Sequence, residues 1–113
     1  MDSEQKYTGE IYNFYMSAFF AIQIAELDRV HSDEILSAID NVIDKLPLTS
    51  DYTHEVYGVL KDVNEFYCIE YDFEYDNDYP LIYSLNFVDS DEYLDAILNK
   101  NTIEYYGKKL TGN

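Results

Sequence analysis

Carboxylates dominate the stretch between Lys61 and Lys100, which contains no Lys, Arg or His. Its eleven acidic residues are Asp62, Glu65, Glu70, Asp72, Glu74, Asp76, Asp78, Asp89, Asp91, Glu92 and Asp95. Because no cation within the stretch can neutralise them, these side chains project a negative field in whatever fold they adopt. The chemistry that such a pattern favours is electrostatic recognition of something basic.

Other chemistry is less well supported by the sequence. The run from Asp72 to Asp78 resembles the start of a calcium loop, but Asn77 takes the place of the required glycine and Tyr83 that of the final glutamate. Cys68, His31 and His54 are too few for a zinc site without carboxylate help, and the four glycines form no phosphate loop. We expect Cys68 to be a small buried residue. The sequence therefore predicts a binding protein with no metal or cofactor, and not an enzyme.

Length and composition predict one folded acidic domain spanning residues 1–113, with residues 1–8 and 107–113 mobile. The 113 residues carry a net charge of −16, yet 47% of them are hydrophobic and 17% aromatic, which is enough for a packed core. The start, MDSEQKYTGE, does not read as a signal peptide, and a single cysteine cannot form an internal disulfide, so we expect a cytoplasmic protein. Anionic membranes and nucleic acids would repel it.

Four helices are predicted from apolar spacing and capping residues. The first runs from about Glu10 to Arg29, and its predicted buried stripe is Ile11, Tyr15, Ala18, Ile22 and Ala25. Because almost its whole circumference is apolar, this helix is expected to lie in the core or against a partner. A second copy of the chain, in a homodimer, is one such partner. The second, Asp33 to about Lys45, is capped by Ser32; the fourth, Asp91 to about Leu98, is capped by Ser90.

The third predicted helix begins after Thr49 or Ser50 and ends near Phe66. It would bury five side chains, those of Tyr52, Val56, Val59, Leu60 and Val63. Its end is open to interpretation, because Tyr67, Tyr71, Tyr75 and Tyr79 are four apart and would also fit a helix continued through residues 62–79.

We favour a strand after Cys68, because apolar and acidic residues alternate there. Ile69, Tyr71, Phe73 and Tyr75 alternate with Glu70, Asp72, Glu74 and Asp76. A turn at residues 77–80 leads to a second strand over residues 81–88, and residues 102–106 predict a short third strand. The fold class is α+β, with about four helices on a small antiparallel sheet in the order α-α-α-β-β-α-β and a hairpin over residues 68–88.

The acidic side of the first strand is the candidate binding surface. Successive carboxylates on one face of a strand lie about 6.6 Å apart, a spacing comparable to that of charges along duplex DNA. A second row would come from Asp33, Asp40 and Asp44, or from Asp91, Glu92 and Asp95. The predicted partner-binding residues are Glu70, Asp72, Glu74, Asp76, Asp78, Tyr79, Asp89, Asp91, Glu92 and Asp95. Among the aromatic residues, Tyr71 and Tyr75 are expected in the core and Tyr79 exposed at the turn.

In size and charge the chain resembles the DNA-mimic proteins of phages and bacteria, including anti-CRISPR and anti-restriction proteins. The resemblance implies an inhibitor that occupies the basic nucleic-acid-binding surface of a nuclease or defence protein. A second hypothesis is an immunity protein that neutralises a basic nuclease toxin without imitating DNA. A third is that the charge serves solubility alone, which explains the net charge better than it explains the clustering.

Overall fold

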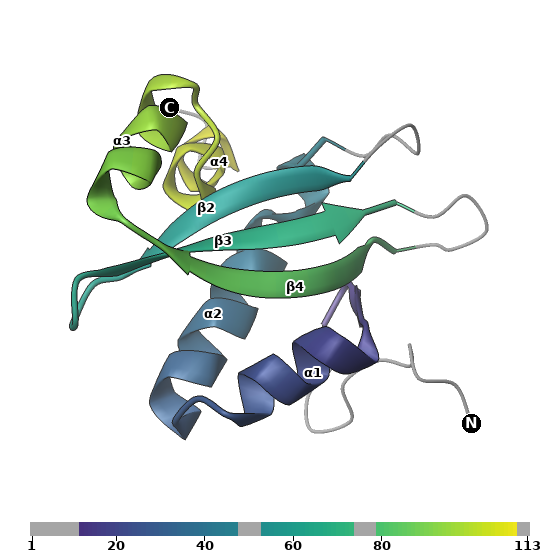
Figure 1. The fold of residues 1–113 in the computed structure, drawn as a ribbon. Helices are drawn as coiled ribbons and strands as arrows, with labels where there is room; N and C mark the ends of the chain where they lie inside the picture. The colour runs from purple at the N-terminus through teal and green to yellow at the C-terminus, as the bar shows by residue number, and fades with distance from the viewer. Residues whose placement is uncertain (1–11, 48–52, 74–78, 111–113) are drawn as a thin grey trace.

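The computed structural model describes residues 12–47, 53–73 and 79–110. For Lys109 and Leu110 it describes the backbone only. Within these ranges, four strands form one sheet in the order β1-β4-β3-β2 (Figure 1). These are β1 (Tyr15–Met16), β2 (His54–Leu60), β3 (Glu65–Asp72) and β4 (Leu81–Val88). Strands β2, β3 and β4 are antiparallel neighbours, whereas β1 runs parallel to β4, so the sheet is mixed.

The helices that the described residues form lie on both sides of this sheet. They are α1 (Ala18–Ala25), α2 (Arg29–Val42), α3 (Ser90–Leu98) and α4 (Ile103–Leu110), with a short 3-10 helix, η1 (Ile43–Lys45), after α2. Helices α1 and α2 cover one face of the sheet, and α3 and α4 lie near the β2 side (Figure 1). The structure is therefore α+β, as the sequence predicts.

The core lies between the sheet and the α1 and α2 layer. Val56 and Leu60 of β2 and Tyr67, Ile69 and Tyr71 of β3 face it. From the helices it receives Phe20, Ile24, Ile35, Leu36, Ile39, Val42 and Tyr106. Tyr71 is buried, as predicted. We call this the inner face of the sheet, and the opposite side the outer face.

The predicted hairpin is confirmed, and the helical alternative for the segment after residue 62 is wrong. Strands β3 and β4 pair antiparallel, and Tyr67, Ile69 and Tyr71 are buried while Glu70 and Asp72 alternate with them. Glu74, Tyr75 and Asp76 lie outside the described residues.

The third predicted helix is wrong, because β2 occupies this part of the chain. Val56 and Leu60 are buried as predicted, but they alternate with Glu55, Tyr57 and Val59 in a period of two. Gly58 fits the strand for a reason that the sequence does not display: the ring of Tyr67 on β3 lies across it. The missing side chain therefore makes room for an aromatic ring in the core.

Helices α1 and α2 begin at residues different from those predicted. Residues 15–16 are a strand, and α1 starts after Ser17, whose Oγ accepts the Phe20 N–H at 3.0 Å. Within α1, Phe20 and Ile24 are buried, whereas the predicted buried stripe (Ala18, Ile22 and Ala25) is exposed. Asp28 caps α2, and the predicted cap, Ser32, is a buried residue inside that helix.

A helix also replaces the short strand predicted at residues 102–106. Thr102 makes a single bridge to Tyr57, and its Oγ1 then accepts the Tyr105 N–H at 3.1 Å, which starts α4. The Tyr57 N–H donates to the carbonyl of Asn101 at 3.1 Å, so the chain after α3 is fastened to the edge of β2. Helix α4 continues to Leu110, well into the segment predicted to be mobile.

Adding a methyl group at residue 58 should destabilise the protein, although alanine is normally better than glycine in a strand. A Cβ there would lie 2.5 Å from Cζ of Tyr67, whose side chain is buried. We expect Gly58→Ala to lower the free energy of unfolding by about 1–3 kcal/mol in urea titrations. In a Tyr67→Leu background the same change should cost less, and equal costs in both backgrounds would refute this explanation.

A histidine links the start of α2 to the turn between β2 and β3. His31 lies 3.0 Å from Asp62 through Nε2 and 3.0 Å from Asp28 through Nδ1. Its pKa is raised, mainly by the hydrogen bond to Asp62, whose own pKa is lowered by the same contact. The link therefore weakens as the pH rises through the raised pKa of His31, and also as it falls through the lowered pKa of Asp62.

His31→Ala should accordingly reduce the free energy of unfolding more at about pH 5.5 than at about pH 8.5, because a larger fraction of the His31 rings is protonated at the lower pH. Urea titrations of both proteins at the two pH values measure the difference. The same loss at both would show that the ionic contact does not contribute to stability.

Candidate acidic binding groove

Two glutamates stand directly opposite each other on the outer face of β2 and β3. Glu55 pairs with Glu70 in the antiparallel ladder, and Glu55 is exposed. Side chains in such a position have Cβ atoms about 4.5–5.5 Å apart, and like charges there are unfavourable. The hydroxyl of Ser84 on β4 donates to Glu70 at 2.5 Å, which fixes one of the two carboxylates.

Helix α3 adds more carboxylates above the same face. Asp89 caps it by accepting the Glu92 N–H at 2.9 Å. Tyr93 stacks on Phe66 of β3 with 4.5 Å between ring centroids, and Tyr57 of β2 donates its hydroxyl to Glu92 at 3.1 Å. These two contacts hold α3 over the outer face.

The carboxylates of the sheet and the helix line two adjoining hollows that share Glu55 and Asn101. The first, of about 250 Å³, is lined by Glu55, Tyr57, Glu92, Asp95, Ala96, Asn99 and Asn101. The second, of about 340 Å³, is lined by Pro47, Thr53, His54, Glu55, Glu70, Tyr71 and Asn101. We call the combined surface the acidic groove. Its carboxylates come from β2, β3 and α3, and neither lysine nor arginine is among its lining residues in the described parts of the chain.

Two weakly acidic groups near the groove respond to its charge. Burial raises the pKa of the Cys68 thiol to about 12, and the neighbouring Glu55 carboxylate adds to the effect. Burial likewise raises the pKa of the Tyr57 hydroxyl, with further contributions from Cys68, Glu55 and the hydrogen bond to Glu92. Cys68 is buried as predicted, and its raised pKa favours the protonated thiol, which is the less nucleophilic form.

The predicted site residues are only partly brought together. Glu70, Glu92 and Asp95 line the acidic groove, and Asp72 follows two residues after Glu70 on the same strand face. Asp89 serves as the cap of α3, and Asp91 lies exposed in its first turn. Tyr79 is half-buried against Tyr15, with ring centroids 5.9 Å apart, so the prediction of an exposed side chain is wrong. Glu74, Asp76 and Asp78 lie outside the described residues.

The second row of carboxylates comes from α3 and not from α2. Asp33 and Asp40 belong to α2, which packs on the inner face. Asp33 pairs with Arg29 at 3.9 Å, and Asp40 accepts the Asn13 N–H at 2.8 Å. Asp33 and Asp40 therefore have local partners, and Asp44 lies in η1, after the end of α2.

Glu55, the carboxylate shared by both hollows, is not among the partner-binding residues predicted from the sequence. The third predicted helix contained it, where it would have had no relation to Glu70. The alternation of His54, Val56, Gly58 and Leu60 with Glu55, Tyr57 and Val59 was the signal that could have placed it on the outer face.

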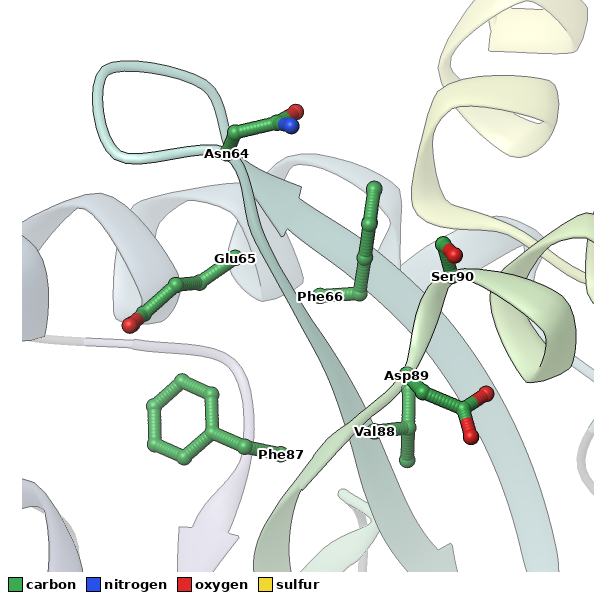
Figure 2. A pocket seen from close by; sticks show the side chains of 7 residues that line it. All are labelled: Asn64, Glu65, Phe66, Phe87, Val88, Asp89 and Ser90. Carbon is green, nitrogen blue, oxygen red and sulfur yellow. The ribbon is translucent and has the colours of Figure 1, made fainter.

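A separate hollow of about 410 Å³ lies where β3 begins and β4 ends (Figure 2). Two carboxylates line it, but Figure 2 shows Glu65 beside Phe87 on one side of the strands and Asp89 on the other. Because these groups diverge and Asp89 already caps α3, the hollow does not present a carboxylate pair that could share a proton or an ion.

Neither metal ligation nor membrane insertion gains support from the described ranges. There, no three His, Cys, Asp or Glu side chains cluster closely enough to hold a metal ion. No helix in the same ranges has the length and apolar character that a membrane span needs. His54 is buried and its ring stacks on Tyr71 at 5.3 Å, which accounts for its position structurally.

The sequence matches no protein-family model, and no curated protein or solved structure is significantly similar to it.

Removing one charge from the facing glutamates should stabilise the fold. We expect Glu55→Gln to raise the free energy of unfolding by about 0.2–1 kcal/mol at low ionic strength, because the like-charge pair is relieved. The gain should shrink in about 1 M salt, where repulsion is screened within a few ångströms. Urea titrations at both ionic strengths measure it; a Glu55→Gln protein that is less stable at low salt would argue against repulsion at this pair.

Proposed function

We propose that this protein is an inhibitory binding protein whose acidic groove occupies the basic nucleic-acid-binding surface of another protein. The observation that carries the proposal is that Glu55, Glu70, Glu92 and Asp95, from three elements, line two adjoining hollows, and that no lysine or arginine is among the described residues lining them. A sheet and a helix that face each other with like charges gain no stability from those charges. A cationic surface of another protein, bound in the groove, would neutralise these carboxylates and so account for their arrangement.

The spacing of these charges supports imitation of a nucleic-acid backbone. Neighbouring strands lie about 4.8 Å apart and alternate residues along one strand about 6.6 Å apart, so Glu55, Glu70 and Asp72 form a short two-dimensional array. Helix α3 adds a second row across the groove through Glu92 and Asp95. Lysine and arginine side chains that hold phosphates of a duplex could reach such rows without rearrangement.

Fixed side chains also favour binding. The Glu92 carboxylate accepts the Tyr57 hydroxyl, and the Glu70 carboxylate accepts the Ser84 hydroxyl. Each carboxylate keeps further acceptor positions for a partner, while its rotamer freedom is already reduced. Charge of one sign across the groove would also raise the association rate with a basic partner, and added salt would lower that rate.

The test is displacement of DNA from purified basic nucleases and DNA-binding proteins. A short fluorescent duplex is bound to each in turn, and the acidic protein is added while anisotropy is recorded. We expect stoichiometric displacement from at least one of them, weakened by salt. The groove variant Glu55→Gln/Glu70→Gln/Asp95→Asn should be at least tenfold weaker, because it removes three facing charges.

The matched control removes the same number of charges elsewhere. Glu26→Gln/Asp33→Asn/Asp44→Asn has the same net charge but leaves the groove intact, so it should displace DNA as the unaltered protein does. Equal weakening of both variants would attribute displacement to net charge alone. Inhibition of a nuclease without loss of its DNA would instead favour the immunity-protein hypothesis.

A further inference from the structure

Helix α3 exposes three large apolar side chains next to the carboxylates of the groove. Leu94, Ile97 and Leu98 are 56%, 47% and 72% exposed, while Tyr93 and Ala96 of the same helix are buried. Residues three and four apart are neighbours on a helix surface, so these three form one continuous strip. We call it the apolar ridge.

The exposed surface of α3 is divided lengthwise by chemistry. Asp91 and Asp95 are four residues apart and form one row; Leu94 and Leu98 form the adjoining row. Asp95 of the acidic row and Glu92, on the side of that row away from the ridge, line the groove. The helix therefore presents carboxylates and leucines in two parallel rows, and the two members of each row lie about 6 Å apart along the helix axis.

The charge pattern decides which occupant fits the ridge. A second copy of this chain would bring its own acidic rows against those of the first, at a net charge of −16 for each protein. A partner with an apolar row beside a basic row would match both rows at once. Side chains about one helical turn apart, as in both rows, match the spacing of side chains along one face of a second helix, because helices pack by interlocking such rows of side chains.

We propose that α3 is the docking element for an amphipathic helix of the partner, which places apolar side chains on Leu94 and Leu98 and Lys or Arg on Asp91 and Asp95. The inference rests on the proposed function, since it names the part of the basic partner that the groove region recognises. It adds that recognition is not purely electrostatic: the ridge slows dissociation, and the charges guide association.

Another exposed apolar pair provides the control. Phe19 and Ile22 on α1 are 60% and 57% exposed, and the first turn of that helix has no acidic residue. The α1 pair matches the ridge in exposure but has no acidic row inside the same helix. Phe19→Ser/Ile22→Ser is therefore the matched variant for Leu94→Ser/Leu98→Ser.

Two synthetic helical peptides serve as probes, and calorimetry measures their binding to the full chain. Both carry the same row of lysines; one has a leucine row beside it and the other has glutamine at those positions. We expect the leucine peptide to bind at least tenfold more tightly. Leu94→Ser/Leu98→Ser should abolish that advantage, whereas Phe19→Ser/Ile22→Ser should preserve it, with circular dichroism confirming that both variants fold.

Any of these peptide-binding results would overturn the inference: equal affinity for the two peptides, no effect of the ridge variant, or an equal effect of the α1 variant. A dimer in light scattering that the ridge variant converts to monomer would also overturn it, because a second copy would then cover the ridge. The DNA-displacement assay separates this failure from that of the proposed function. If the ridge variant displaces DNA normally and the groove variant does not, only the docking inference fails; if the groove variant also displaces DNA normally, the proposed function fails.

Discussion

The alternation of side chains along β2 and β3 is the constraint on which the rest of the structure depends. Val56, Tyr67, Ile69 and Tyr71 are buried against α1 and α2, and this burial fixes the register of the two strands. Because the side-chain period of a strand is two, a slip by one residue would expose these aromatic and branched side chains and bury the glutamates. The core therefore decides which residues share the outer face, and it brings Glu55 opposite Glu70 whatever their charges.

The cost of that arrangement is small compared with the burial that imposes it. Two unit charges about 5 Å apart in water repel by about 0.8 kcal/mol, and physiological salt reduces this further. Full burial of one large apolar side chain contributes about 1.5–3 kcal/mol. The fold can thus hold like charges together on one face, while α3, attached through Tyr93 and Tyr57, adds further acids and the apolar ridge to the same region.

The sequence is informative where its apolar residues fit only one repeat, that of a strand or that of a helix. It is misleading where they fit both. In β3, apolar residues alternate with acids and a turn follows, so the strand, its hairpin and the outward direction of Glu70 and Asp72 could be predicted. In β2 and the turn after it, Val56, Val59, Leu60 and Val63 also satisfy a helical spacing, and the capping residues before them strengthen that interpretation. Pairing with β3 and the ring of Tyr67 over Gly58 decide for the strand, and both are tertiary interactions. The error removed Glu55 from the predicted site, because its importance comes only from its partner across the ladder.

The central claim is that negative potential is concentrated over the acidic groove and is not spread evenly over an acidic protein. Nuclear magnetic resonance with small cationic and anionic paramagnetic cosolutes measures this directly, since each broadens the amides that it approaches. The ratio of cationic to anionic broadening should be highest for residues 54–58 of β2, for Glu70 and for the first two turns of α3. It should be clearly lower along α2, where Arg29 and His31 accompany the acids. A ratio that is uniform over both faces, or highest along α2, would contradict the account.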